Sequence, residues 1–175
     1  MNIFVIGPYC SGTSSAAQLV RGCGFYIGAP HELLPATSEN PSGTVEARWL
    51  VDFNDDLLFL FGTAWHSAAR LDVDTLPALL REQLHQRAAT WAARMAQHGY
   101  WACTDPRLCL TARFWLQVLP AALIVLCLRH PRDVVAAMLQ RQPYSFVNPE
   151  AALAVWRRSF LGAVLDTAIG PDAVR

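Results

Sequence analysis

The residues best able to do chemistry stand near the start of the chain, in the loop Gly-Pro-Tyr-Cys-Ser-Gly-Thr-Ser at residues 7–14. A short apolar run precedes this loop, and a stretch of helical composition follows it. Gly7 and Gly12 have the spacing of a phosphate-binding P-loop, and Ser14 stands where that motif ends in Ser or Thr. The lysine position of the motif holds Thr13. The pattern predicts an anion cradle of backbone N–H groups, a helix N-terminus and hydroxyls, without a lysine.

Two more polar turns are expected at the same edge of the sheet. The expected strand over residues 124–128 leads directly into Arg129, and the strand over residues 100–102 precedes Asp105 and Arg107. Because ligands bind at the carboxyl ends of parallel strands, the three turns predict a site for a ligand with several negative charges. Two simpler interpretations stay open. A Gly/Ser turn can merely join a strand to a helix, and arginines at a helix N-terminus can be solvent-exposed.

The elements that must position these residues alternate between strands and helices. Apolar residues at three- and four-residue steps favour helices, and short apolar runs bounded by Gly or Pro favour strands. We expect helices over residues 14–21, 45–61, 75–97, 112–119, 131–141 and 149–167, and strands over residues 2–7, 25–27, 100–104 and 121–128.

This alternation predicts one α/β domain over residues 1–175, with three α/β/α layers and a mostly parallel central sheet covered on both faces. The run over residues 121–128 is the best candidate for a fully buried strand. Residues 28–42 have loop composition, and we expect them to shape an acceptor pocket together with the two long helices that follow.

Composition excludes several classes of protein. Although 53% of the residues are hydrophobic, no run approaches the ~20 apolar residues of a membrane span, and we expect no signal peptide. A formal net charge of zero argues against a general nucleic-acid binder. All 14 basic residues are arginine, which excludes any mechanism that depends on lysine.

The five cysteines form no Cys-x-x-Cys pair, so we expect neither a zinc site nor any other metal site. Their odd number suits reduced thiols in a cytoplasmic protein. Three of them stand in apolar surroundings and are expected to be small core residues: Cys103, Cys109 and Cys127.

Seven pieces of the sequence, spread over nearly the whole chain, carry a resemblance to a known family. They are residues 11–14 (Ser-Gly-Thr-Ser), 40–46 (Asn-Pro-Ser-Gly-Thr-Val-Glu), 52–58 (Asp-Phe-Asn-Asp-Asp-Leu-Leu), 105–107 (Asp-Pro-Arg), 114–120, 128–134 (Leu-Arg-His-Pro-Arg-Asp-Val) and 153–156. In this order they resemble a bacterial sulfotransferase of the P-loop-like family that uses 3'-phosphoadenosine 5'-phosphosulfate. The resemblance explains the missing lysine, because the family's loop has Thr at that position.

The resemblance implies transfer of a sulfuryl group from this nucleotide donor to a hydroxyl or amine of a small-molecule or carbohydrate acceptor, without a metal. Residues Ser11 to Ser14 would hold the phosphosulfate, and Arg129 would pair with the 3'-phosphate through its guanidinium fork. Glu46 is the candidate base, although a glutamate there also suits a helix N-terminus. Weaker candidates for the base are His31, His66 and His130.

Three departures from the family pattern bear on activity. Cys10 stands where the family normally has a basic residue that stabilises the leaving phosphate, and Arg107 is a candidate to supply that charge instead. Ala137 replaces a serine that helps to hold the 3'-phosphate. The chain also ends at Arg175, before the expected C-terminal part of the fold, which predicts an open sheet edge and apolar surface suited to homo-oligomers.

The leading hypothesis is therefore a sulfotransferase. The alternative is a catalytically impaired descendant that binds the nucleotide or a protein partner, and both Cys10 and Ala137 favour it. The third hypothesis is a P-loop kinase or nucleotide triphosphatase. Thr13 and the absence of lysine argue against it.

Overall fold

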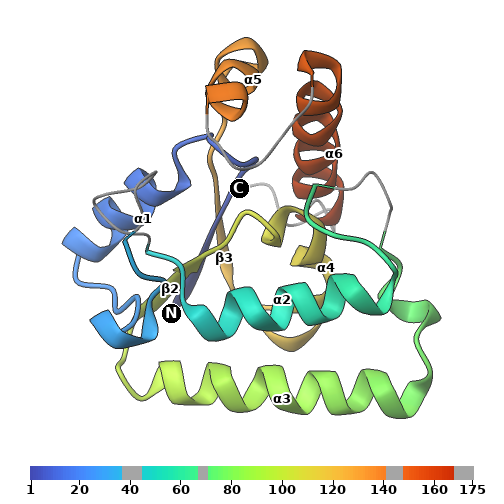
Figure 1. The fold of residues 1–175 in the computed structure, drawn as a ribbon. Helices are drawn as coiled ribbons and strands as arrows, with labels where there is room; N and C mark the ends of the chain where they lie inside the picture. Colours follow the sequence, from blue (N-terminus) through green and yellow to red (C-terminus); the bar gives the residue numbers. More distant parts are fainter. Residues whose placement is uncertain (37–44, 67–70, 141–147, 168–175) are drawn as a thin grey trace.

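The computed structural model describes residues 1–36, 45–66, 71–140 and 148–167. Its described strands form one parallel sheet in the order β2-β1-β3, so the first strand of the chain lies in the middle (Figure 1). The strands are β1 (Asn2–Ile6), β2 (Trp101–Thr104) and β3 (Leu123–Leu126). The described residues thus confirm an α/β fold with a parallel sheet.

The register of the sheet brings the three strand ends together. Val5 lies beside Thr104 of β2, and Ile6 lies beside Leu126 of β3. Since all strands run in the same direction, the segments that follow β1, β2 and β3 start from one edge of the sheet. This is the edge at which the sequence predicts an anion site.

The helices lie close to their predicted positions. They are α1 (Thr13–Gly22), α2 (Arg48–Leu60), α3 (Ala78–Ala96), α4 (Leu108–Val118), α5 (Pro131–Gln140) and α6 (Pro149–Thr167), with short 3-10 turns at Pro30–Glu32 and Val73–Thr75. The largest difference is the start of α4, which begins four residues earlier than predicted. Its first turn contains Leu108 and Cys109, both completely buried, so core packing extends the helix toward β2.

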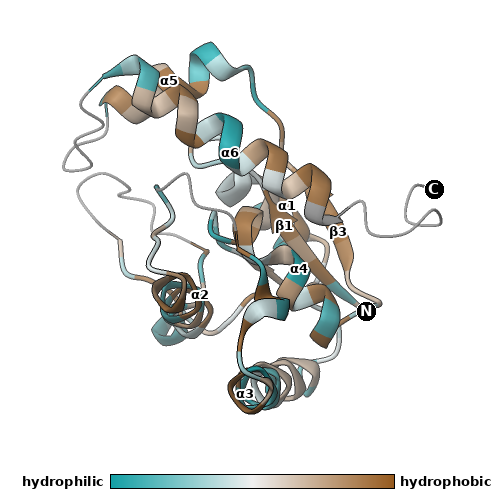
Figure 2. Ribbon diagram, turned by 90° about the vertical axis from the view of Figure 1, so that its right-hand side faces the viewer, coloured by the Kyte–Doolittle hydropathy of each residue, from teal (hydrophilic) through white to brown (hydrophobic). Residues whose placement is uncertain are grey.

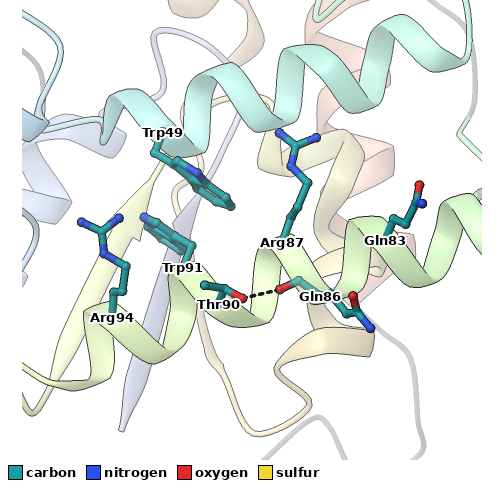
Figure 3. Close-up of a pocket in the computed structure, with 7 residues that line it drawn as sticks. All are labelled: Trp49, Gln83, Gln86, Arg87, Thr90, Trp91 and Arg94. Atoms are coloured by element: carbon teal, nitrogen blue, oxygen red, sulfur yellow. Dashed lines mark hydrogen bonds between the residues drawn. The ribbon is translucent and has the colours of Figure 1, made fainter.

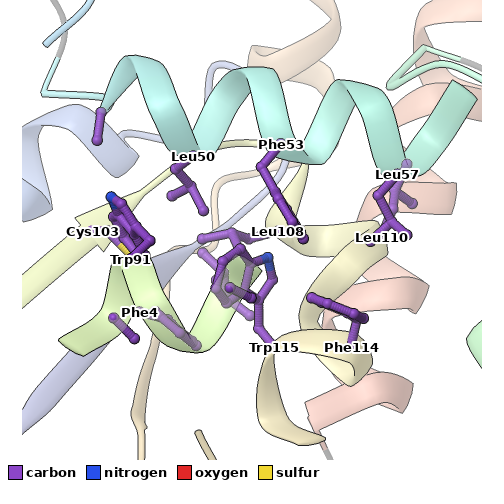
Figure 4. Packing of buried hydrophobic residues seen from close by; sticks show 14 of the residues in the cluster. Phe4, Leu50, Phe53, Leu57, Trp91, Cys103, Leu108, Leu110, Phe114 and Trp115 are labelled. Atoms are coloured by element: carbon purple, nitrogen blue, oxygen red, sulfur yellow. The ribbon is translucent and has the colours of Figure 1, made fainter. Parts of the chain in front are cut away.

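Helices cover both faces of the sheet, as predicted. On one face, Ile3 and Val5 pack against Ala17 of α1 and against Ile27 and Val45. The side chains of alternate β1 residues point to the other face and enter the larger core, to which α2, α3 and α4 contribute. Aromatic rings from β1, α2, α3 and α4 pack together with leucines in this core (Figure 4).

Strand β3 differs from its prediction as a fully buried strand. Leu123 is 51% exposed and Val125 is 37% exposed, and Figure 2 shows this apolar strand at the side of the sheet. They share a sheet face with Ile3 and Val5, but α1 packs over β1 and β2 on that face. An apolar run indicates a strand, but it does not reveal whether a helix will cover it.

The short strand predicted over residues 25–27 is reduced to a single bridge, which joins Tyr26 to Trp101 of β2. Gly24 and Gly28, with φ angles of 90° and 118°, stand at the two ends of this segment. Both φ values belong to the left-handed region, which is incompatible with an extended strand, so the pairing cannot continue in either direction.

The predicted placement of the cysteines holds for Cys103 and Cys109, which are buried, whereas Cys127 is half-buried. Burial in an apolar environment raises the pKa of all three thiols because it disfavours the thiolate. These cysteines are therefore held as neutral thiols. In the part of the chain that the structure describes, no helix is both long and apolar enough to cross a membrane.

Candidate anion-binding site

The loop between β1 and α1 forms a tight turn that leaves several N–H groups unused. Ser11 donates its backbone N–H to the carbonyl of Pro8 at 3.0 Å, and Gly12 precedes the first turn of α1 with a φ of 96°. Cys10 has a φ of 65°, an uncommon value for a residue other than glycine. Within the described residues, the N–H groups of residues 12–15 have no backbone acceptor, as expected at a helix N-terminus. They form a cluster of donors suited to an anion.

The loop folds back closely over the end of β1, and this requires glycine at position 7. A Cβ atom at Gly7 would lie 2.5 Å from the Ser11 hydroxyl and 2.6 Å from the carbonyl oxygen of Cys127. Ser11 is 8% exposed, and its hydroxyl has no hydrogen-bond partner among the described residues. A buried hydroxyl without a partner is unfavourable, so it is a donor available to a bound ligand. Its chemistry fits the oxygen atoms of a phosphate or sulfate group.

Arg129 is brought to this loop from the end of β3. Its Nη1 donates to the carbonyl oxygen of Cys10 at 3.2 Å, although the two residues are 119 positions apart in the chain. The guanidinium is exposed to solvent and still has free donors. The structure thus places the predicted phosphate-binding arginine against the predicted loop, at the one position where the loop departs from the family pattern.

Helices α5 and α6 support the other side of the loop. Tyr9 and Cys10 pack against the buried residues Val134 and Met138 of α5, together with Ala152 and Val155 of α6. This contact explains the placement of the loop, because an apolar cluster holds its tip against two helices. Ala137 lies on α5 and is half-buried.

Arg107 lies within an ion-paired group. Its Nε donates to Asp55 at 2.6 Å, and its Nη1 donates to Asp105 at 3.0 Å. Desolvation opposes its charge, but the two carboxylates outweigh that cost and raise the pKa of Arg107. Because both contacts neutralise the guanidinium, Arg107 is not a free cation next to Cys10, and its role in nucleotide binding stays a prediction.

Asp105 is completely buried, and Asn54 of α2 completes its hydrogen bonding. The Nδ2 of Asn54 donates to Asp105 at 2.8 Å, while its Oδ1 accepts from the Trp115 indole at 2.8 Å and from Thr111 at 3.1 Å. Burial raises the pKa of Asp105, although Arg107 and Asn54 act in the opposite direction. These bonds join α2, α4 and the end of β2.

Asn54 belongs to a segment that carries the family resemblance, but it is not among the site residues predicted from the sequence. A signal was present, because Asn54 stands at helical spacing from Leu50 and Leu57, on the face of α2 predicted to be buried. A polar residue on such a face requires partners from other elements. Which residues become the partners of Asn54 depends on tertiary contacts, and no local sequence pattern reveals them.

Glu46, the candidate base, is half-buried just before α2. Its backbone carbonyl accepts a hydrogen bond from Leu34 at 2.9 Å. The preceding residue, Val45, packs with Val5 and Ala17, which places this part of the chain beside β1 and α1. Residues 40–44 of the matching segment lie outside the described residues, and the catalytic role of Glu46 stays a prediction.

The three histidines that are alternative candidates for the base have different surroundings. The Nδ1 of His130 accepts the N–H of Arg132 at 3.3 Å, so His130 caps α5. His66 is exposed and its ring lies 5.5 Å from that of Trp65, which in turn lies 5.1 Å from Tyr9 of the loop. His31 is exposed in the first 3-10 turn. In the described ranges, no group of three His, Cys, Asp or Glu side chains could hold a metal ion.

An α/β domain with an anion-binding loop at the carboxyl edge of its parallel sheet belongs to a broad class that binds phosphorylated ligands. The comparison with known families identifies the group within this class. The model of the Sulfotransferase family matches residues 2–173, and the chain therefore belongs to that family. No curated protein and no solved structure matches the chain significantly.

Proposed function

We propose that this protein transfers a sulfuryl group from 3'-phosphoadenosine 5'-phosphosulfate to a hydroxyl or amine of a small-molecule or carbohydrate acceptor. Membership of the Sulfotransferase family supports the type of reaction. The observation that carries the proposal is the loop itself, where the buried Ser11 hydroxyl and the N–H groups at the start of α1 have no hydrogen-bond acceptor or donor among the described residues. Arg129 lies across the same loop and adds a positive charge.

In the proposed reaction, the acceptor oxygen or nitrogen attacks sulfur, and the bond from sulfur to the oxygen of the 5'-phosphate breaks. That oxygen leaves with the bonding electron pair, and Glu46 takes the proton of the acceptor. The N–H groups of residues 12–15 and the hydroxyls of Ser11 and Thr13 stabilise the negative charge that develops on the leaving phosphate. Arg129 binds the 3'-phosphate.

A second candidate is a descendant of the family that still binds the nucleotide but transfers sulfate poorly. Two observations favour it. Cys10 brings no positive charge to the leaving phosphate, and Arg107 is neutralised by Asp55 and Asp105.

A binding titration with 3'-phosphoadenosine 5'-phosphate tests both candidates against an unrelated function. We expect saturable binding that Arg129→Ala weakens by about 2 kcal/mol, or about thirtyfold, because a charged hydrogen-bonded contact is lost. Arg132→Ala is the matched control, since Arg132 is an exposed arginine of the same turn and uses only its backbone N–H in the contact with His130. Absence of binding contradicts the proposal, and equal effects of the two variants contradict the placement of the 3'-phosphate.

A further inference from the structure

Two adjoining cavities lie between α2 and α3, outside the loop site. Their volumes are about 590 Å³ and 400 Å³, and both are lined by Trp49, Trp91 and Arg94. Figure 3 shows the residues that line the larger cavity. These volumes lie in the range typical of small-molecule sites. The segments that form them are the ones expected to shape the acceptor pocket.

The cavities lie toward the opposite end of the sheet from the loop. The ring of Trp91 is 5.5 Å from that of Trp101, and Trp101 pairs with Asn2 at the amino ends of the strands. The loop follows Ile6, four residues further along β1, which corresponds to about 13 Å at ~3.3 Å per residue. Residues 7–14 of the loop line neither cavity, so a small molecule bound between α2 and α3 has no described contact with the loop.

Aromatic surface forms one wall of the groove. The rings of Trp49 and Trp91 are nearly parallel, with an angle of 5° between planes and 4.9 Å between centroids. Trp91 is buried and Trp49 is half-buried. Figure 3 shows the two indoles in the gap between the helices, with the side chains of Arg94 and Arg87 on either side. This arrangement offers ring edges and part of a ring face to another planar molecule.

Positive charge flanks this aromatic wall. The larger cavity is lined by Arg87 and Arg94 and by no acidic residue among those described. Arg87 has a long contact of 3.4 Å with Asp56, and its guanidinium lies over the ring of Phe53. The side chain of Arg94 is exposed and forms no hydrogen bond or ion pair with any described residue, although its charge attracts the carboxylate of Glu32 and helps to lower the pKa of that group. The groove therefore has, beside its tryptophans, a guanidinium that forms no direct ion pair with a described residue.

Two acidic residues, Glu32 and Asp52, line the smaller cavity. The carboxylate of Glu32 is already occupied, because one of its oxygens accepts both the hydroxyl of Tyr26, at 2.6 Å, and the backbone N–H of Ala29, at 2.8 Å. Asp52 is exposed on α2 and forms no ion pair with a described arginine. An anionic group is therefore better placed on the side of Arg94 that faces the larger cavity, which neither carboxylate lines.

The remaining polar groups of the larger cavity come from the same face of α3, and they are neutral: Gln83, Gln86 and Thr90. Arg87 and Arg94 are seven residues apart on this face, about 10 Å along the helix axis. The larger cavity thus combines hydrogen-bonding groups without charge and two guanidinium groups around one aromatic wall.

We propose that this tryptophan groove (Trp49, Arg87, Thr90, Trp91 and Arg94) is a second ligand site, which binds a planar aromatic anion. The ring of the ligand packs against the two indoles, and its anionic group binds the guanidinium of Arg94. The side chains of Gln83 and Gln86 supply further hydrogen bonds. The site is independent of the proposed sulfuryl transfer, because it needs neither the loop nor the nucleotide.

The test is a calorimetric titration of the full chain with 2-naphthalenesulfonate, alongside the neutral 2-naphthol. We expect saturable binding of the sulfonate and binding weaker by about fivefold or more for the naphthol. Arg94→Gln should weaken the binding of the sulfonate by about the same factor. Thr90→Trp should abolish it, because an indole at this exposed position fills the groove. Melting temperatures of the variants establish that each one is folded.

Two controls distinguish binding in the groove from binding in the loop and from a general effect of lost charge. Arg81→Gln removes an equal charge from the same helix outside both cavities, and Arg129→Ala alters the loop. Both should leave the binding of the sulfonate unchanged, as should saturating 3'-phosphoadenosine 5'-phosphate. Three outcomes would each overturn the proposal. Arg94→Gln and Arg81→Gln could weaken binding equally, the nucleotide could displace the sulfonate, or the sulfonate could show no saturable binding below about 10 mM.

Discussion

Asp105 and Arg107 form an ion pair of 3.0 Å in which the carboxylate is completely buried and the guanidinium side chain is 16% exposed. The same carboxylate accepts the backbone N–H of Arg107 at 3.0 Å, and its other oxygen is bound by Asn54. The pair closes the turn after β2 and attaches it to α2. An arginine that appears in the sequence as a candidate ligand-binding cation is thus part of the scaffold at the carboxyl edge.

Asp105→Ala should lower the free energy of unfolding by about 3 kcal/mol or more, because the Nη1 of Arg107 and the Nδ2 of Asn54 both lose their buried acceptor. Urea unfolding measures this change. The matched control is Asp56→Ala, which breaks the exposed pair with Arg87 and should cost no more than about 1 kcal/mol. Similar losses for the two variants would show that the buried network contributes no more than a surface ion pair.

Gly162→Ala should destabilise the protein by about 1–3 kcal/mol, because the new methyl group meets the backbone carbonyl of Cys109 where α6 packs on α4. Gly22→Ala provides the control. That glycine also lies in a helix, but its added Cβ meets no atom within 4 Å, so the helix propensity of alanine should leave stability equal or higher. The prediction fails if thermal unfolding shifts equally in both variants.

The hydrogen bonds of Glu32 should make stability depend on pH. The Tyr26 hydroxyl and then the Ala29 N–H lower the pKa of Glu32 below its unfolded value of about 4.3. A lowered pKa in the folded state gives a stabilisation that is present above the unfolded pKa and is lost as pH falls through the folded pKa. When the pH is lowered from about 6 to about 3, the free energy of unfolding of the Tyr26→Phe variant should therefore decrease less than that of the wild type. Identical losses in urea unfolding would contradict this role of the Tyr26 hydroxyl.

Cys10→Lys should raise the rate of sulfuryl transfer by about tenfold or more, because a positive charge next to the leaving phosphate stabilises the transition state. Cys23→Lys is the control, since Cys23 is an exposed cysteine just after the other end of α1. Turnover with 3'-phosphoadenosine 5'-phosphosulfate and a panel of acceptors measures the effect. If the wild type binds the nucleotide but neither it nor Cys10→Lys transfers sulfate, the impaired descendant is the better description.

Local patterns were sufficient to predict most elements of the fold. The apolar run before Gly7, the helical spacing from Trp49 to Phe61 and the prolines at positions 131 and 149 each define an element through residues that are close in the chain. The resemblance to the family likewise rests on motifs in the linear sequence, and the family match over residues 2–173 confirms membership of the family.

The sequence by itself determined the α/β class and the family, and it predicts an anion-binding loop, because each of these depends on residue type and short spacing. Only the tertiary structure decided that Leu123 and Val125 stay exposed, that Arg107 is ion-paired and that Arg129 contacts Cys10. It also decided that α2 and α3 form a groove flanked by positive charge at the far end of the sheet. The physical reason is that burial, charge neutralisation and cavities depend on contacts between residues that are distant in the chain, and no local pattern contains them.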